Sequence, residues 1–416
     1  MSATKKCVYY ITGHGYGHAT RSFELVRMLI SLNYQVIIVS SLNETFIHAN
    51  LSQYFDDGSV FYESRTLDSG AVQLGPLDLD CRKTLLSYYN QVHANHKQIK
   101  DSETRFLTES NAKFIISDVT PIACSAAFEA GLKVLIVSNL SWDCIYQQMV
   151  SDLNGVVSKE ELTKYKAAIL QIQYDYNCCH HLLQLPGPTP LFLTDSSKVI
   201  PAPLLSRPST FDLPKLCMTL NIPNLVETCL SHRKLLLSFG GHATDKLKLS
   251  DSHLPDGWIC FLLGFDSDSY PHLSSRFIFC PRDTYVPDLV AVCDVVLGKI
   301  GYGTVSECLS TTPVTPLVYV PRQGWAEEPA LVKLMEWNSA CVCISRDDFF
   351  AGGWAACLQQ ALELSLTPKQ YIPEPISDLL SNCEGQSAVQ YDYLKLSGEE
   401  AARWIGDTIH QLASSS

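Results

Sequence analysis

Gly298-Lys299-Ile300-Gly301-Tyr302-Gly303-Thr304-Val305-Ser306-Glu307 is the stretch that decides the fold, because it joins two apolar runs, 289–297 and 316–320. This order predicts a strand that turns into a helix, with Thr304 as a candidate helix cap. Backbone N–H groups at such a turn, with the positive end of a helix, bind anions. Glu307 lies almost one helical turn further on and faces the same way. The stretch therefore indicates a phosphate site beside a carboxylate, which suits a ribose attached to a diphosphate.

Length, charge and composition bound the fold and the partners. A chain of 416 residues is too long for one ordinary core, so we expect two domains. The net charge of −12, without a basic run, argues against a nucleic-acid partner. No apolar stretch reaches the roughly 18 residues of a membrane helix, and the first residues lack the features of a signal peptide. We therefore expect a cytoplasmic globular protein.

Strand-like and helix-like segments alternate through both halves of the chain. Such repeated units predict parallel sheets covered by helices on both faces. Prolines cluster between residues 186 and 208 and indicate a linker over 186–210. We expect two α/β Rossmann-like domains, residues 1–195 and 196–416, with closing helices at the end of the second. The expected strands are 7–12, 36–40, 114–119, 134–139, 234–239, 258–264, 277–280, 290–297 and 317–320.

A first glycine-rich turn, residues 12–21, follows the first expected strand and opens the first helix. Its glycines, Gly13, Gly15 and Gly17, are spaced two apart, unlike the Gly-x-Gly-x-x-Gly of dinucleotide-binding proteins. No acidic residue closes the second strand, so a nicotinamide dehydrogenase is not expected. Ligands bind at the carboxyl ends of parallel strands, and we therefore interpret this turn as a ligand-facing loop on the acceptor side. The alternative is that the glycines only permit a tight turn.

The same turn carries two histidines, His14 and His18, which are candidate general bases because imidazole titrates near neutral pH. Asp118 ends an expected strand at the same edge of the sheet and is a candidate to orient one of them. For Asp118 the alternative is helix capping.

Other glycine turns and acidic pairs in the second half point to the donor side. Gly240 and Gly241 follow an expected strand, so their N–H groups are candidates to contact a phosphate, although a plain turn is an equal alternative. Tyr285 is a candidate to stack on a base. Glu327 and Glu328 follow another strand and are candidates to accept hydrogen bonds from sugar hydroxyls, or simply favour a helix N-terminus.

Two weaker signals consist of residue types that bind metal ions. Asp266-Ser267-Asp268 lies in a polar loop, and Cys178-Cys179-His180-His181 has adjacent rather than metal-binding spacing. We interpret the first as a solvated loop and the second as packing. No metal site and no cofactor are therefore expected, other than a nucleotide-sugar co-substrate.

These motifs together resemble the GT-B glycosyltransferases, whose two Rossmann-like domains face each other across a cleft. The turn 12–21 is similar to the Gly-Gly-x-x-Gly-His loop of the transferase that builds the peptidoglycan lipid precursor, with His18 in the place of the motif histidine. Residues 285–328 resemble the donor-site signature of UDP-sugar transferases. Within that signature, Lys299 stands near the position of a diphosphate-binding histidine, and the pair Glu327-Glu328 replaces an acid–glutamine pair.

The resemblance to UDP-sugar transferases implies roles for the donor-side residues. It implies Glu307 on the ribose hydroxyls and Glu327 or Glu328 near the donor sugar. Tyr285 falls where the signature has an aromatic residue over uracil. The residues implied around the diphosphate are Gly301, Gly303 and Thr304.

A narrower resemblance spans most of residues 7–365. Segments 10–21, 67–73, 138–143 and 297–307 resemble, in order, the N-terminal glycosyltransferase-like part of plant-type L-arabinokinases. The sugar-kinase phosphate loop Gly-Leu-Ser-Ser-Ser of those proteins is absent from this sequence, so we do not expect arabinokinase activity.

The sequence thus predicts a metal-independent hexosyl- or pentosyltransferase. It would move a sugar from a nucleoside-diphosphate sugar, UDP preferred, to an acceptor hydroxyl with inversion. The alternatives are a nucleotide-sugar epimerase or hydrolase and a non-catalytic nucleotide-sugar binding or regulatory module.

Overall fold

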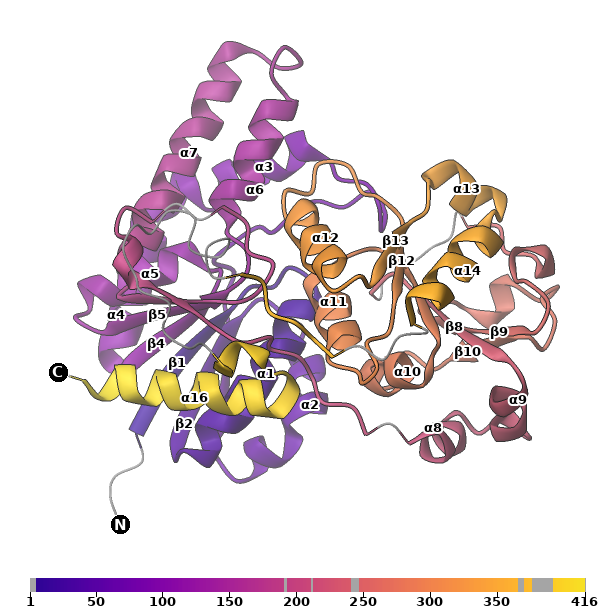
Figure 1. The fold of residues 1–416 in the computed structure, drawn as a ribbon. Helices are drawn as coiled ribbons and strands as arrows, with labels where there is room; N and C mark the ends of the chain where they lie inside the picture. The colour runs from indigo at the N-terminus through magenta and orange to yellow at the C-terminus, as the bar shows by residue number, and fades with distance from the viewer. Residues whose placement is uncertain are drawn as a thin grey trace.

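The computed structural model describes residues 5–190, 193–210, 212–240, 247–365, 370–375 and 392–415. Within these residues two parallel β-sheets, each flanked by helices, form two domains that lie side by side (Figure 1). This arrangement confirms the predicted pair of Rossmann-like α/β domains.

The first sheet has 7 strands in the order β3-β2-β1-β4-β5-β6-β7, and every neighbouring pair is parallel. Alternate residues of the central strand enter different cores, since Tyr9 packs on one face and Tyr10 on the other. Burial on both faces explains why these strands are apolar without a break. The strands are β1 (Lys5–Ile11), β2 (Tyr34–Ser40), β3 (Val60–Ser64), β4 (Phe114–Asp118), β5 (Lys133–Ser138), β6 (His181–Gln184) and β7 (Val199–Pro201).

Helices connect these strands and cover the sheet. They are α1 (Tyr16–Ser31), α2 (Glu44–Asp56), α3 (Cys81–Gln91), α4 (His96–Glu109), α5 (Pro121–Glu129), α6 (Trp142–Asp152) and α7 (Lys159–Asn177). None of the described helices is both long and apolar enough to cross a lipid bilayer.

The second sheet has 6 parallel strands in the order β10-β9-β8-β11-β12-β13. The strands are β8 (Arg233–Ser238), β9 (Trp258–Leu263), β10 (Phe277–Cys280), β11 (Val295–Gly298), β12 (Leu317–Tyr319) and β13 (Cys341–Cys343). Its helices are α8 (Leu213–Leu220), α9 (Leu225–Ser231), α10 (Val286–Val292), α11 (Tyr302–Leu309), α12 (Glu328–Trp337), α13 (Arg346–Ala351) and α14 (Trp354–Ser365).

Two predicted segments differ from the structure. The strand expected over 290–297 is only β11, because residues 286–292 form α10, with a proline in its first turn. A short apolar run does not distinguish a buried helix from a strand, and a proline at that position favours the helix. The expected linker 186–210 contains β7, which ends at Pro201 on the edge of the first sheet, where a strand tolerates proline.

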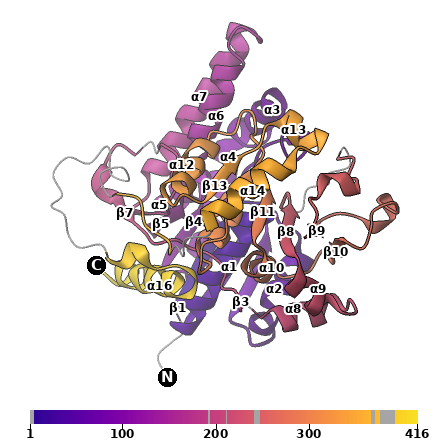
Figure 2. The ribbon, with the colours of Figure 1, turned by 45° about the vertical axis from the view of Figure 1, so that its right-hand side comes forward.

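The end of the described chain returns to the first domain. Helix α16 (Gly398–Ser414) packs against α1, where Gly406 faces Met28 (Figures 1 and 2). The two segments that connect the domains also pair with each other through a parallel bridge between Leu204 and Ser397. The expected boundary after residue 195 precedes β7 of the first sheet.

Gly298 is needed where β11 meets β8, because a Cβ at this position would overlap the carbonyl oxygen of Ser238. We expect Gly298→Ala to destabilise the protein by about 2 kcal/mol or more, since the clash involves backbone that cannot rotate away. Gly301→Ala is the matched control, because a Cβ there has no neighbour within 4 Å. Urea unfolding of both variants checks this, and equal midpoints would contradict it.

Candidate functional site

The stretch that follows β11 is an uncapped helix N-terminus. Helix α11 begins at Tyr302 after the extended residue Gly301, and no side chain caps it. Thr304 lies inside the first turn, so the expected cap at Thr304 is wrong, because the helix starts two residues earlier. The free N–H groups of this first turn and the helix dipole make a site that favours an anion.

Lys299 lies beside this helix end and points toward the turn after β8. Its Cε would lie 3.3 Å from a Cβ built on Gly240, which has a positive φ of 65°. Burial lowers the pKa of Lys299 to about 7, and the nearby positive charge of Arg322 adds to this effect. An anion bound here would restore the charged form. Gly241, the second glycine predicted to bind phosphate, lies outside the described residues.

Glu307 and Tyr285, both predicted on the nucleoside side, lie together around Arg207. Nε of Arg207 donates to Glu307 Oε1 at 2.8 Å, and the guanidinium carbon lies 5.3 Å from the centre of the Tyr285 ring. The Tyr285 hydroxyl donates to the carbonyl of Pro208 at 2.7 Å. Sequence reasoning missed Arg207, because it lies in the proline-rich segment interpreted as a linker.

Glu327 and Glu328 are adjacent in sequence but have different partners. Glu328 accepts from Nε and the backbone N–H of Arg322, each at 2.9 Å, and both side chains are buried. Glu327 instead faces the first domain and accepts from Nδ2 of Asn139 at 3.0 Å. Of the two carboxylates predicted near the donor sugar, Glu328 is thus committed to a buried ion pair, and Glu327 to an interdomain hydrogen bond.

His18 and Asp118 form a pair in the first domain, in which Asp118 is buried and His18 is partly exposed. Nδ1 of His18, on α1, lies 2.9 Å from Oδ2 of Asp118, at the end of β4. Arg21, one turn further along α1, donates to the other carboxylate oxygen at 2.6 Å. Burial alone would raise the pKa of Asp118, but the charges of Arg21 and His18 hold it below its ordinary value. Asp118 does not cap α5, the alternative considered from the sequence.

His14 has a different environment. Its Nδ1 accepts the backbone N–H of Ala71 at 3.1 Å, so a neutral His14 carries its proton on Nε2. Nε2 lies 3.4 Å from the side-chain amide nitrogen of Gln73, and Trp142 and Trp325 flank the imidazole with ring centres at 5.4 and 5.8 Å. His14 therefore presents a hydrogen-bond donor, whereas His18 presents an unprotonated Nε2 when Nδ1 donates to Asp118.

Asp68 is a buried carboxylate that sequence reasoning missed. It follows β3 and lies near Thr12, Gly70 and His18. Burial raises the pKa of Asp68 to about 6. The segment 67–73 supported the resemblance to L-arabinokinases, but only the fold brings Asp68 to the glycine–histidine turn.

The two predicted loops meet between the domains. A Cβ on Gly303, in the first turn of α11, would lie 3.9 Å from Cα of Gly17 in the first turn of α1. The guanidinium of Arg21 lies over the Tyr302 ring, with its carbon 4.7 Å from the ring centre. Gly13 packs against Ser41, and Gly15 has a positive φ of 78°. The structure therefore brings the histidine-bearing turn and the anion-binding helix end into contact.

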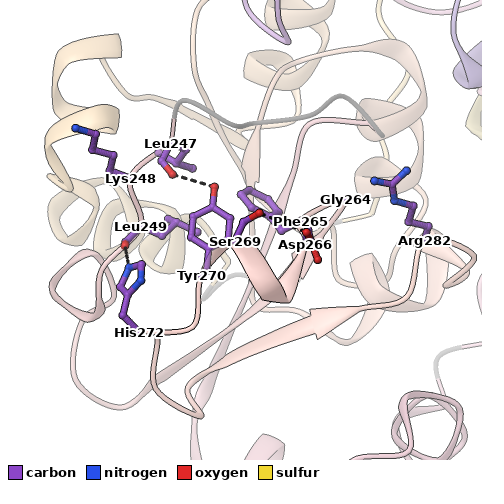
Figure 3. Close-up of a pocket in the computed structure, with 10 residues that line it drawn as sticks. All are labelled: Leu247, Lys248, Leu249, Gly264, Phe265, Asp266, Ser269, Tyr270, His272 and Arg282. Carbon is purple, nitrogen blue, oxygen red and sulfur yellow. Dashed lines mark hydrogen bonds between the residues drawn. The ribbon is translucent and has the colours of Figure 1, made fainter.

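A cavity of about 490 Å³ opens at the carboxyl ends of β9 and β10 in the second sheet (Figure 3). Lys248 and Arg282 lie at its two ends, and Tyr270 and His272 donate to backbone carbonyls in its wall. Asp266 lines this cavity and caps the short turn 267–269, which agrees with the interpretation of a solvated loop.

The Cys178-Cys179-His180-His181 segment, the second weak metal signal, also takes part in local hydrogen bonding. His180 accepts the backbone N–H of Val134 at 3.0 Å. Among the described residues, no three His, Cys, Asp or Glu side chains gather in a metal-binding arrangement.

Known proteins share this architecture. The glycotransferase of kitacinnamycin superposes with a TM-score of 0.59 at 14% identity, covering 98% of this chain and 99% of that one. A UDP-glucosyltransferase from Polygonum tinctorium, capable of glucosylating indoxyl, gives a TM-score of 0.57 at 11% identity, with both chains covered completely at 100%. The chain has the GT-B fold. At these identities the likeness carries the fold alone.

One curated relative is similar in sequence. An L-arabinokinase of Arabidopsis thaliana is 34% identical over 358 residues, which are 86% of this chain and 32% of the relative. The chain thus spans about a third of the length of the curated relative that it matches. No model of a known protein family matches the chain. The GT-B fold and this relative confirm the resemblances that the sequence motifs carried.

The pair Arg322–Glu328 gives a prediction about stability. Glu328→Ala would leave a buried guanidinium without its carboxylate, so we expect a loss of about 3 kcal/mol or more in the free energy of unfolding. Glu336→Ala is the matched control, because Glu336 is exposed on the same helix. The double variant Arg322→Met, Glu328→Leu should recover much of the loss. Denaturant unfolding measures all three, and a Glu328→Ala protein as stable as the control would refute the structural role.

Proposed function

We propose that this protein is a glycosyltransferase that moves a hexosyl or pentosyl group from a nucleoside-diphosphate sugar, UDP preferred, to an acceptor hydroxyl. The observation that carries the proposal is the contact between two helix ends. The first turn of α1 bears His18, paired with Asp118, and it meets the uncapped first turn of α11. A base and an anion site that adjoin each other are what transfer from a diphosphate leaving group requires. The fold of known glycosyltransferases supports the same proposal.

His18 is the better of the two candidate bases. With its Nδ1 proton donated to Asp118, its Nε2 has a free lone pair that can accept the proton of an acceptor hydroxyl. His14 accepts a backbone N–H through Nδ1 and so presents a donor at Nε2. We therefore assign proton abstraction to His18 and orientation of its imidazole to Asp118. His14 would only line the site.

The proposed step is a direct displacement. The acceptor oxygen gives its proton to His18 and attacks the anomeric carbon, while the bond from that carbon to the diphosphate oxygen breaks. The N–H groups at the start of α11 and the ammonium of Lys299 stabilise the charge of the departing diphosphate, without a metal in this scheme. Displacement from the opposite face inverts the anomeric configuration.

The nucleoside would lie against Tyr285, with its ribose near Glu307. Glu307 pairs with Arg207, so the ribose hydroxyls would share or replace this contact. Glu327 lies nearer than Glu328 to the meeting point of the domains, since it reaches Asn139 of the first domain. We therefore favour Glu327 over Glu328 as the carboxylate closer to the donor sugar.

The base assignment predicts unequal effects of the two histidines. We expect His18→Ala to lower kcat by roughly 100-fold or more, with little change in KM for the donor, because only proton transfer is lost. His14→Ala should lower kcat less than tenfold. Steady-state kinetics with a UDP-sugar and an acceptor panel checks this order. Equal losses, or none from His18→Ala, would contradict the assignment.

Lys299 predicts the pH dependence of nucleotide binding. With a free pKa of about 7, raised by a bound diphosphate, affinity should be fully present below pH 7 and should fall by up to tenfold per unit above it. Calorimetry with UDP between pH 7 and 9 measures this slope. Lys299→Met should bind more weakly at pH 7 and lose the slope. A slope that survives in Lys299→Met would rule out this role.

The same calorimetry, extended to UDP-sugars and followed by product analysis, separates the alternative functions. UDP binding followed by transfer to an acceptor supports the proposal. Release of free sugar, or a changed sugar, without an acceptor favours a hydrolase or epimerase. Binding without turnover across the acceptor panel favours a binding or regulatory module, and no binding of UDP counts against all three.

A further inference from the structure

The pairing of His18 with Asp118 depends on a third side chain, Arg21. Nη2 of Arg21 donates to Asp118 Oδ1, and Nη1 donates to Asn139 Oδ1, each at 2.6 Å. The guanidinium also covers the ring of Tyr302, which belongs to the second domain. Arg21 is 4% exposed, so water screens these contacts weakly. Two strand ends of the first domain and one helix of the second therefore converge on this side chain.

Asn139 extends these contacts into the second domain. Its Nδ2 donates to Glu327 Oε1 at 3.0 Å, while its Oδ1 accepts from Arg21. Because a guanidinium only donates and a carboxylate only accepts, the orientation of this amide is fixed by its partners. All the side chains between Glu327 and Asp118 are buried. A continuous hydrogen-bonded chain thus runs from the start of α12 to the proposed base.

The charge of Arg21 acts directly on His18. Nη2 of Arg21 lies 3.0 Å from Nδ1 of His18, and at this distance an unbalanced guanidinium disfavours the imidazolium that a base must become. Asp118 balances this charge from one side. Glu327 balances it from the other, since the two charges interact across Asn139. The other titratable groups that face this chain are Tyr9, Asp68, Lys299, Tyr302 and Arg322.

We infer that Arg21 is a positioning residue for His18, and that Glu327, acting through Asn139, is the contact by which the second domain sets it. The inference rests on the proposed role of His18 as a base. It follows that the action of His18 as a base depends on the second domain lying where the structure has it. The donor-side domain then controls the base as well as holding the nucleotide.

The test compares Glu327→Gln and Asn139→Ala with Glu336→Gln, an equivalent charge removal at an exposed position of α12. Histidine-selective NMR follows the titration of His18 in each full-length protein, with the signal identified from His18→Gln. Glu327→Gln should move the titration midpoint of His18 to lower pH by about half a unit or more, because one of the two carboxylates that balance Arg21 is lost. Asn139→Ala should move it in the same direction by less, because it removes only the amide between the two charges. Glu336→Gln should titrate like the wild type.

Kinetics gives a second readout. Where transfer is observed, both chain variants should lower kcat about tenfold at neutral pH and shift the acid limb of its pH profile with the NMR midpoint. In Asn139→Ala, which removes no group assigned to the donor sugar, KM for the donor should change less than twofold. Arg21→Lys keeps the positive charge but loses the planar guanidinium that donates to Asp118 and Asn139 together. It should therefore lower kcat, and its pH profile should differ from that of the wild type.

Two results overturn the inference. One is a His18 titration that is unchanged in both Glu327→Gln and Asn139→Ala. The other is a loss of activity in Asn139→Ala that lies wholly in KM for the donor. Calorimetry with UDP on the same proteins keeps this failure apart from failure of the proposed function. If the wild type binds UDP and transfers sugar, and the titration of His18 moves in neither variant, the inference is wrong and the proposed function stands. If UDP does not bind the wild type, the proposed function fails.

Discussion

The ion pair between Arg21 and Asp118 is the interaction on which the centre of the molecule depends. It is buried where water cannot compensate either charge, so removing one partner would leave the other exposed to a low-dielectric interior. The pair joins the first turns of α1 to the end of β4, and through Asn139 to the end of β5. The position of His18, and the approach of the second domain, follow from these fixed points.

Paired charges recur throughout the site. Glu307 pairs with Arg207 and Glu328 with Arg322, whereas Glu327 accepts a hydrogen bond from the neutral amide of Asn139. A ligand with its own hydroxyls and phosphates therefore exchanges partners with these groups rather than uncovering bare charges. Such exchange costs less than desolvating a free carboxylate, and it makes affinity sensitive to how well the ligand's groups match those they displace. Lys299 is the exception, because its charge is itself unstable without an anion nearby.

Most of the fold was predictable from the sequence, because buried parallel strands are apolar without a break and glycine turns mark their carboxyl ends. The two glycine turns, with His18, Asp118 and Glu307, were found in this way. Arg21 and Asn139 were not predicted as site residues, because their role depends on a hydrogen bond between residues 118 positions apart in the sequence. Arg207 and α10 were missed for local reasons, namely proline-rich sequence and an apolar run that suits helix and strand alike.

The path of the chain restricts how the two domains can move. The second domain is inserted between β7 and α16 of the first, and its two connecting segments are joined by the bridge between Leu204 and Ser397. The chain just before and just after the inserted domain is thus held together by this bridge, so these two points cannot move apart without breaking it.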